Sequence, residues 1–193
     1  MTARMNLKHK MGTGIHAQSF IEGMTRNQDE FLSWYNRFSW KEGEKSFFDV
    51  IGAGKDVHCL ILCTDWCPDV IWNVPVLFRV LEQSPITVEV LLMEQHLETM
   101  DLFLTDGGRA QPIAVFVDAQ GNVLGKWGPR PRYIQAVMED FRKNNPDREA
   151  PDYQENVSRV RTEIAKLYNA GTEYQQVIVQ ELRQLLSTLF SHV

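Results

Sequence analysis

The segment VHCLILCTDWCPD, residues 57–69, contains an abrupt change of pattern. Its first half, Val57 to Cys63, is a nearly continuous apolar run, which is typical of a strand buried on both faces. Apolar residues then recur at helical spacing from Val70 to Leu81. The sequence therefore predicts a strand, a tight loop and a helix, with Cys67 in the loop.

The flanking sequence continues this alternation of helical and strand patterns. Thr25 with Gln28, and Thr172 with Gln175, form the spacing of a helix capping box. Asp118 to Asn122 is a glycine-containing turn between two strand patterns, which predicts an antiparallel hairpin. We expect two short helices within 15–38, helices at 44–51, 96–104, 133–141, 152–169 and after Gly171, and strands at 57–63, 86–92, 113–117 and 123–127.

The length and composition bound the organisation and the partners. A chain of 193 residues with 44% hydrophobic and 23% charged residues is ordinary for a globular protein. We expect one domain made of an N-terminal helical extension (1–43), an α/β core (44–145) and a C-terminal helical extension (146–193). A net charge of −5 without a basic stripe argues against nucleic-acid binding. Apolar runs far shorter than about 20 residues argue against a membrane span.

The cysteines indicate a reducing compartment. There are three, Cys59, Cys63 and Cys67, an odd number within one short segment, which does not suit a disulfide framework. No apolar segment of signal-peptide length follows the basic N-terminus. We therefore expect a cytoplasmic protein. A metal site is not expected, because the predicted strand carries Cys59 and Cys63 away from Cys67; no cofactor is expected either.

Cys67 is the candidate reactive group. A helix N-terminus favours a thiolate through its unpaired N–H groups and partial positive charge, and Pro68 suits the first helical position. Asp65 and Asp69 are like charges to a thiolate and oppose this effect. No Lys, Arg or His lies within three residues of Cys67. Cys59 is expected to be a buried apolar residue.

At these positions the chain resembles the thioredoxin superfamily, and specifically a bacterial thioredoxin-like group whose active loop reads Trp-Cys-Gly-Asp or Trp-Cys-Pro-Asp. Trp66 and Cys67 match the family's tryptophan and nucleophilic cysteine, Pro75 its helix-kinking proline, and Pro112 its cis-proline. The resemblance covers about 44–143. It implies a thioredoxin fold, with a mixed central sheet and flanking helices.

The same resemblance implies a substrate platform beside the thiol. In this family the cis-proline exposes the preceding backbone, here Gln111, so that an extended substrate can pair beside the cysteine. Gln111, Pro112 and Trp127 would form the platform, next to the active-site loop of Asp65, Trp66, Pro68 and Asp69.

Two departures from the family pattern separate the function hypotheses. Val70 stands where a second, resolving cysteine is usual, and Ile61 stands where the family has a buried carboxylate. The first hypothesis is a monothiol oxidoreductase or de-thiolating protein that uses Cys67, with a mixed disulfide resolved by Cys63 or by a low-molecular-weight thiol. The alternative is a non-catalytic binding or scaffold protein that uses Trp66, Trp127 and Pro112.

The expected partners follow from these hypotheses. They are a protein or a low-molecular-weight thiol or disulfide. The apolar face from Val177 to Phe190 either packs on the chain's own core or pairs with a second copy as a homodimer.

Overall fold

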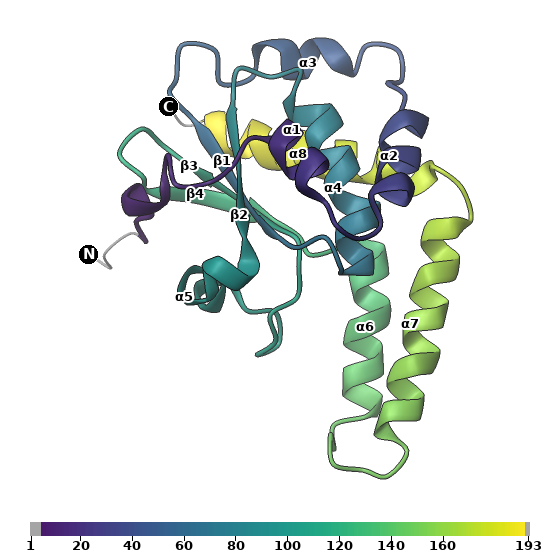
Figure 1. Ribbon diagram of the computed structural model, residues 1–193. Helices are drawn as coiled ribbons and strands as arrows, with labels where there is room; N and C mark the ends of the chain where they lie inside the picture. Colours follow the sequence, from purple (N-terminus) through teal and green to yellow (C-terminus); the bar gives the residue numbers. More distant parts are fainter. Residues whose placement is uncertain (1–4, 192–193) are drawn as a thin grey trace.

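A four-stranded mixed sheet forms the centre of the molecule in the computed structural model, which describes residues 5–191 (Figure 1). The strand order is β2-β1-β3-β4, with β1 parallel to β2 and antiparallel to β3, and β3 antiparallel to β4. The strands are β1 (His58–Cys63), β2 (Thr87–Leu92), β3 (Ile113–Val117) and β4 (Val123–Trp127). The predicted hairpin is therefore confirmed.

Helices flank this sheet, and the predicted mixed α/β class is confirmed. In Figure 1 the antiparallel pair α6 and α7 extends beyond the sheet. The helices are α1 (Ala17–Gly23), α2 (Gln28–Arg37), α3 (Lys45–Val50), α4 (Pro68–Leu81), α5 (Leu97–Met100), α6 (Arg132–Asn144), α7 (Tyr153–Asn169) and α8 (Glu173–Phe190). Three short 3-10 helices are η1 (Lys8–Lys10), η2 (Met93–Gln95) and η3 (Asp101–Phe103).

Successive side chains of β1 point to opposite faces of the sheet, so β1 contributes to two separate core clusters. Cys59, Ile61 and Cys63 belong to the larger cluster, which contains the buried faces of α4 and α8. Leu60 and Leu62 belong to a second cluster, which contains residues of α5, η3 and β3. Because both faces of β1 are covered, its apolar run is continuous rather than alternating, as the sequence predicted.

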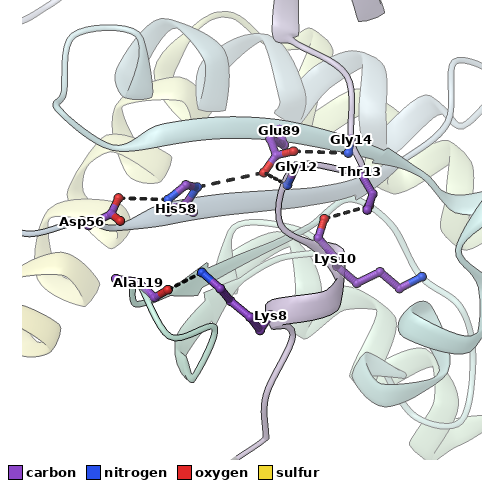
Figure 2. A network of polar contacts seen from close by, with 9 residues as sticks. All are labelled: Lys8, Lys10, Gly12, Thr13, Gly14, Asp56, His58, Glu89 and Ala119. Atoms are coloured by element: carbon purple, nitrogen blue, oxygen red, sulfur yellow. Dashed lines mark hydrogen bonds and ion pairs between the residues drawn. The ribbon is translucent and has the colours of Figure 1, made fainter.

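An N-terminal strap, residues 6–15, crosses the sheet and was not predicted from the sequence (Figure 2). Its anchor is Glu89 of β2, which is 6% exposed. The carboxylate of Glu89 accepts hydrogen bonds from the backbone N–H of Gly12 at 3.0 Å and of Gly14 at 3.2 Å. His58 Nδ1 lies 4.0 Å from the same carboxylate. A buried charge on the sheet thus holds the strap in place.

Neither predicted capping box forms. Asn27, in the left-handed region at φ 58°, is the N-cap of α2, and the hydroxyl of Thr25 donates to Asp65 instead. Thr172 is the N-cap of α8 but makes no side-chain capping bond. Gln175 donates to a backbone carbonyl of α2. In both cases a partner distant in the sequence replaces the local bond.

The C-terminal helices pack on the rest of the chain. In α8, Tyr174, Ile178, Val179, Leu182 and Leu186 are buried and belong to the larger core cluster. Packing of the predicted apolar face on its own core is confirmed, while pairing with a second copy stays a prediction. Among residues 5–191, no helix combines the length and the apolar character that a bilayer crossing needs.

Candidate functional site

Cys67 is the N-cap residue of α4 and Pro68 its first residue, as the sequence predicted. The sulfur-bearing residue is half-buried, next to Trp66, which is 47% exposed. Cys59 and Cys63 are both 0% exposed. Of the three thiols, only that of Cys67 is within reach of a reagent in solution.

The surroundings of Cys67 disfavour its thiolate. Burial raises the pKa of the Cys67 thiol to about 11, and the carboxylate of Asp69 adds to the rise. Hydrogen bonds from the backbone N–H groups of Val70 and Asp69, together with the charge of Arg130, lower this pKa but do not prevail. The thiol is therefore protonated at neutral pH. The helix N-terminus is present, but its stabilisation of the thiolate is outweighed.

Arg130 fixes Asp69 in the first turn of α4. Its Nε donates to Oδ1 of Asp69 at 2.8 Å and its Nη2 donates to Oδ2 at 2.6 Å, a bidentate pair. The two side chains are only 10% and 13% exposed. Burial raises the pKa of Asp69 although Arg130 opposes the shift. A third bond, from Nη1 to Gln135 at 2.9 Å, holds the guanidinium in place.

Sequence reasoning missed Arg130. Arg130 lies 61 positions after its partner Asp69, and no spacing rule links the two. Arg109, another arginine distant in the sequence from Cys67, pairs with Asp101 instead.

Helix α7 also supports the start of α4. The side-chain amide of buried Asn73 donates to the backbone carbonyl of Asp69 at 2.7 Å and to the hydroxyl of Tyr168 at 2.8 Å. Tyr168 stacks on Trp72, with ring centroids 4.4 Å apart. Burial raises the pKa of Tyr168 well above its ordinary value, so its hydroxyl stays neutral. The C-terminal extension thus forms part of the framework of the thiol site.

Asp65 attaches the active-site loop to the turn between α1 and α2. Its Oδ2 accepts hydrogen bonds from the backbone N–H of Thr25 at 2.8 Å and of Arg26 at 3.2 Å, and from the Thr25 hydroxyl at 3.1 Å. Burial raises the pKa of Asp65, but these hydrogen bonds outweigh it and leave the pKa below its usual value. This residue therefore positions the loop.

Trp66, the next residue of the loop, is held by a hydrogen bond to η2. Its Nε1 donates to Oε1 of Glu94 in η2 at 2.7 Å. The indole remains exposed, so Trp66 offers a fixed apolar surface beside Cys67. Glu94 was not predicted from the sequence, because its partner lies 28 positions away.

The three residues of the predicted substrate platform, Gln111, Pro112 and Trp127, are buried. The Gln111–Pro112 peptide bond is cis, but both residues are buried, Gln111 to 3% exposure. Trp127 is 6% exposed, and its Nε1 donates to Glu181 of α8 at 2.7 Å. Because α8 packs beside β4, the indole of Trp127 faces the interior rather than a partner.

Cys63 is also poorly placed for a resolving role. It ends β1 inside the core, and burial raises its pKa well above the ordinary value, with a further contribution from Cys67. Val70 and Ile61, which replace the family's second cysteine and buried carboxylate, are fully buried. Within residues 5–191, no three His, Cys, Asp or Glu side chains are grouped so as to hold a metal ion.

The sheet order, the cysteine at the N-cap of α4 and the cis bond before Pro112 define a protein of the thioredoxin fold. The sequence model of the family described as Thioredoxin matches residues 14–142, so the chain belongs to that family. No curated protein matched the chain.

Two solved structures show the same fold. One is a protein of unknown function from Pseudomonas aeruginosa, at 15% identity and a TM-score of 0.68, covering 95% of this chain and 98% of that one. The other is an HIV epitope-scaffold, at 14% identity and a TM-score of 0.64, covering 95% and 99%. At these identities the likeness concerns the fold alone.

Proposed function

We propose that this protein is a monothiol thioredoxin-like protein that exchanges disulfides through Cys67 and holds its partner as a mixed disulfide. The observation that carries the proposal is that Cys67 is the one reachable thiol among the three, at the N-cap of α4. It rests beside exposed Trp66, with no second thiol at position 70.

The raised pKa of Cys67 favours retention of the partner over rapid turnover. A thiol with a pKa of about 11 supplies little thiolate at neutral pH, so it attacks a disulfide slowly. Once joined to a partner, the same sulfur is a poor leaving group. Displacement of Cys67 from the mixed disulfide by an incoming thiol is therefore slow.

The exchange balances without a cofactor. Cys67 gives its proton to water, and its sulfur attacks one sulfur of a partner disulfide. The partner's own S–S bond breaks, and the departing sulfur takes up a proton and leaves as a thiol. Return of Cys67 to its reduced form requires an external thiol of a protein or a small molecule, because Cys63 is enclosed in the core.

Incubation with dithiobis(nitrobenzoate), followed by intact and peptide mass spectrometry, tests this proposal. We expect one adduct, on Cys67, in the unmodified protein and in Cys63→Ser, and none in Cys67→Ser. An adduct that persists in Cys67→Ser would show that another thiol reacts and would refute the proposal.

The second candidate is a binding or scaffold protein without thiol exchange. The replacement of both the second cysteine and the buried carboxylate, by Val70 and Ile61, favours it. Partner capture that is equal for the unmodified protein and Cys67→Ser would support this alternative. A stoichiometric mixed disulfide on Cys67 would argue against it.

The single cysteine in the Trp66–Asp69 loop supports assignment to the bacterial monothiol group of the family. Three free thiols suit a reducing compartment, and we propose the cytoplasm.

A further inference from the structure

A cavity of about 210 Å³ lies beside the active-site loop. It opens to the surface and is bounded by α1 and the preceding Ile15, by the residues that follow β1, and by the end of β2 with η2. Phe20, Met24 and Leu92 make its apolar wall, while Thr64 and Glu94 supply polar atoms. None of the predicted site residues except Asp65 lines it.

The topology explains why a cavity forms at this place. Parallel strands β1 and β2 end at the same edge of the sheet. The chain leaves β1 for α4 on one face, but leaves β2 for η2 and α5 on the other face. Because the two connections diverge, a crevice opens beyond the carboxyl ends of these strands, the usual location of ligand sites in open α/β sheets.

The residues that line the cavity favour a ligand with a narrow aliphatic part and a group that donates hydrogen bonds. Thr64 is 2% exposed, and its hydroxyl has no hydrogen-bond partner in the described structure. Buried hydroxyl groups normally form a hydrogen bond, so the Thr64 hydroxyl is a polar atom in the cavity wall that a bound side chain can engage. Glu94, which is exposed, and Asp65 are two acidic residues in the wall of the cavity.

The volume of the cavity and its acidic lining residues indicate which class of ligand fits. Pockets for drug-sized ligands usually measure about 300–1,000 Å³, so this cavity suits a single side chain. Lys and Arg combine an aliphatic stem with a cationic end that donates hydrogen bonds. An anionic small thiol would instead meet the carboxylates of Glu94 and Asp65.

We propose that this cavity receives a Lys or Arg side chain that neighbours the reacting cysteine in a protein partner of Cys67. The inference rests on the proposed function, since the partner is held by its disulfide. Asp65, in the cavity wall, is two residues from Cys67, so their Cα atoms are at most about 7 Å apart. A residue next to the partner's cysteine spans that distance.

Exchange kinetics with synthetic peptides test the proposal. Three peptides differ only in the residue before cysteine, which is Lys, Met or Glu, and each carries thionitrobenzoate in disulfide linkage. Attack by Cys67 on the peptide sulfur releases the coloured thiol. We expect the Lys peptide to react about tenfold faster than the Glu peptide, with the Met peptide between them.

Two variants separate a specific site from general attraction to a protein of negative net charge. Glu94→Gln keeps an acceptor for Trp66 Nε1 but removes the charge, and should reduce the ratio of the Lys-peptide rate to the Met-peptide rate several-fold. Thr64→Val removes the unpartnered hydroxyl and should also weaken the Lys preference, with no loss of thermal stability. Glu139→Gln, on the exposed face of α6, is the matched control and should retain the preference.

The possible results distinguish failure of the cavity inference from failure of single-thiol exchange through Cys67. Equal rates for the three peptides, or a Lys preference that survives both Glu94→Gln and Thr64→Val, would overturn the cavity inference and leave single-thiol exchange intact. Absence of thiol release from every peptide would overturn single-thiol exchange and the cavity inference together.

Discussion

At the residue scale, Cys67 is subject to opposing influences from its own helix. The N–H groups of Val70 and Asp69 favour the thiolate, as at any helix N-terminus. Burial and the Asp69 carboxylate disfavour it more strongly. The bond between Asp69 and Arg130 matters here, because it holds the carboxylate beside the sulfur and partly compensates its charge.

Substitution Asp69→Asn should lower the pKa of Cys67. The carboxylate raises this pKa as a like charge, and its removal also leaves the positive charge of Arg130 uncompensated beside the sulfur. A fall of one pKa unit increases the thiolate population about tenfold at pH 8. The alkylation rate with iodoacetamide as a function of pH measures the shift.

The same variant should be less stable, because Arg130 loses its partner in a largely buried position. We expect a decrease of about 3 kcal/mol in the free energy of unfolding. Asp140→Asn, an exposed position on α6, is the control and should change neither quantity. A pH profile of Asp69→Asn that coincides with that of the unmodified protein would contradict the assigned role of Asp69.

At the element scale, local patterns in the sequence predicted the α-helices and strands. The helix expected at 96–104 is α5 followed by the 3-10 helix η3, and η1 and η2 were not predicted. The start of α4 was predicted because Cys67 and Pro68 are adjacent and carry their own preferences for the cap and the first turn. The Asp69–Arg130 pair and the N-terminal strap were not predicted. Both join segments distant in the sequence through side-chain bonds that leave no periodic signal. The burial of Trp127 was not predicted for the same reason, since α8 covers this residue only in the folded chain.

The strap offers a test of one such distant bond. Glu89→Ala removes the acceptor of the N–H groups of Gly12 and Gly14, and should lower the free energy of unfolding by about 2 kcal/mol. Glu89→Gln keeps one acceptor oxygen and should cost less. Denaturant unfolding measures the stability, and limited proteolysis near residues 12–14 reports release of the strap.

Comparison of Glu89→Ala with Glu89→Gln serves as the control, because both variants remove the charge but only Glu89→Gln keeps an acceptor oxygen. Equal stability of Glu89→Ala and the unmodified protein, with no new cleavage in the strap, would show that Glu89 does not anchor it.

At the scale of the whole molecule, the helices after Pro151 are part of the one core. Residues of α7 and α8 pack in the same cluster as β1 and α4. Tyr168 and Glu181 further bind these helices to Asn73 and Trp127 around the thiol site. The C-terminal extension therefore stabilises both the fold and the position of the active-site loop.

A chain that ends at Pro151 should lose cooperative folding. Five large side chains of α8 are buried, and at roughly 2 kcal/mol each their burial contributes on the order of 10 kcal/mol, comparable with the net stability of a domain. Thermal unfolding followed by circular dichroism measures the effect. Sedimentation of the full chain and of the truncated chain separates loss of folding from loss of a dimer. A truncated chain that melts cooperatively at the same temperature would contradict this prediction.

The rate of Cys67 alkylation as a function of pH, with the labelled residue identified by mass spectrometry, tests the account most directly. A pKa of about 11 predicts a rate that rises without a plateau up to pH 10, with label on Cys67 alone. At pH 7 the thiolate fraction of Cys67 is about 300-fold below that of an ordinary cysteine with a pKa near 8.5. A more basic thiolate is also a stronger nucleophile, so the expected alkylation rate of Cys67 is only about 20-fold lower than that of the ordinary cysteine. Cys59→Ser and Cys63→Ser should follow the same profile. A plateau near pH 7, or label on Cys63 in the folded protein, would contradict a single, unactivated exchange thiol.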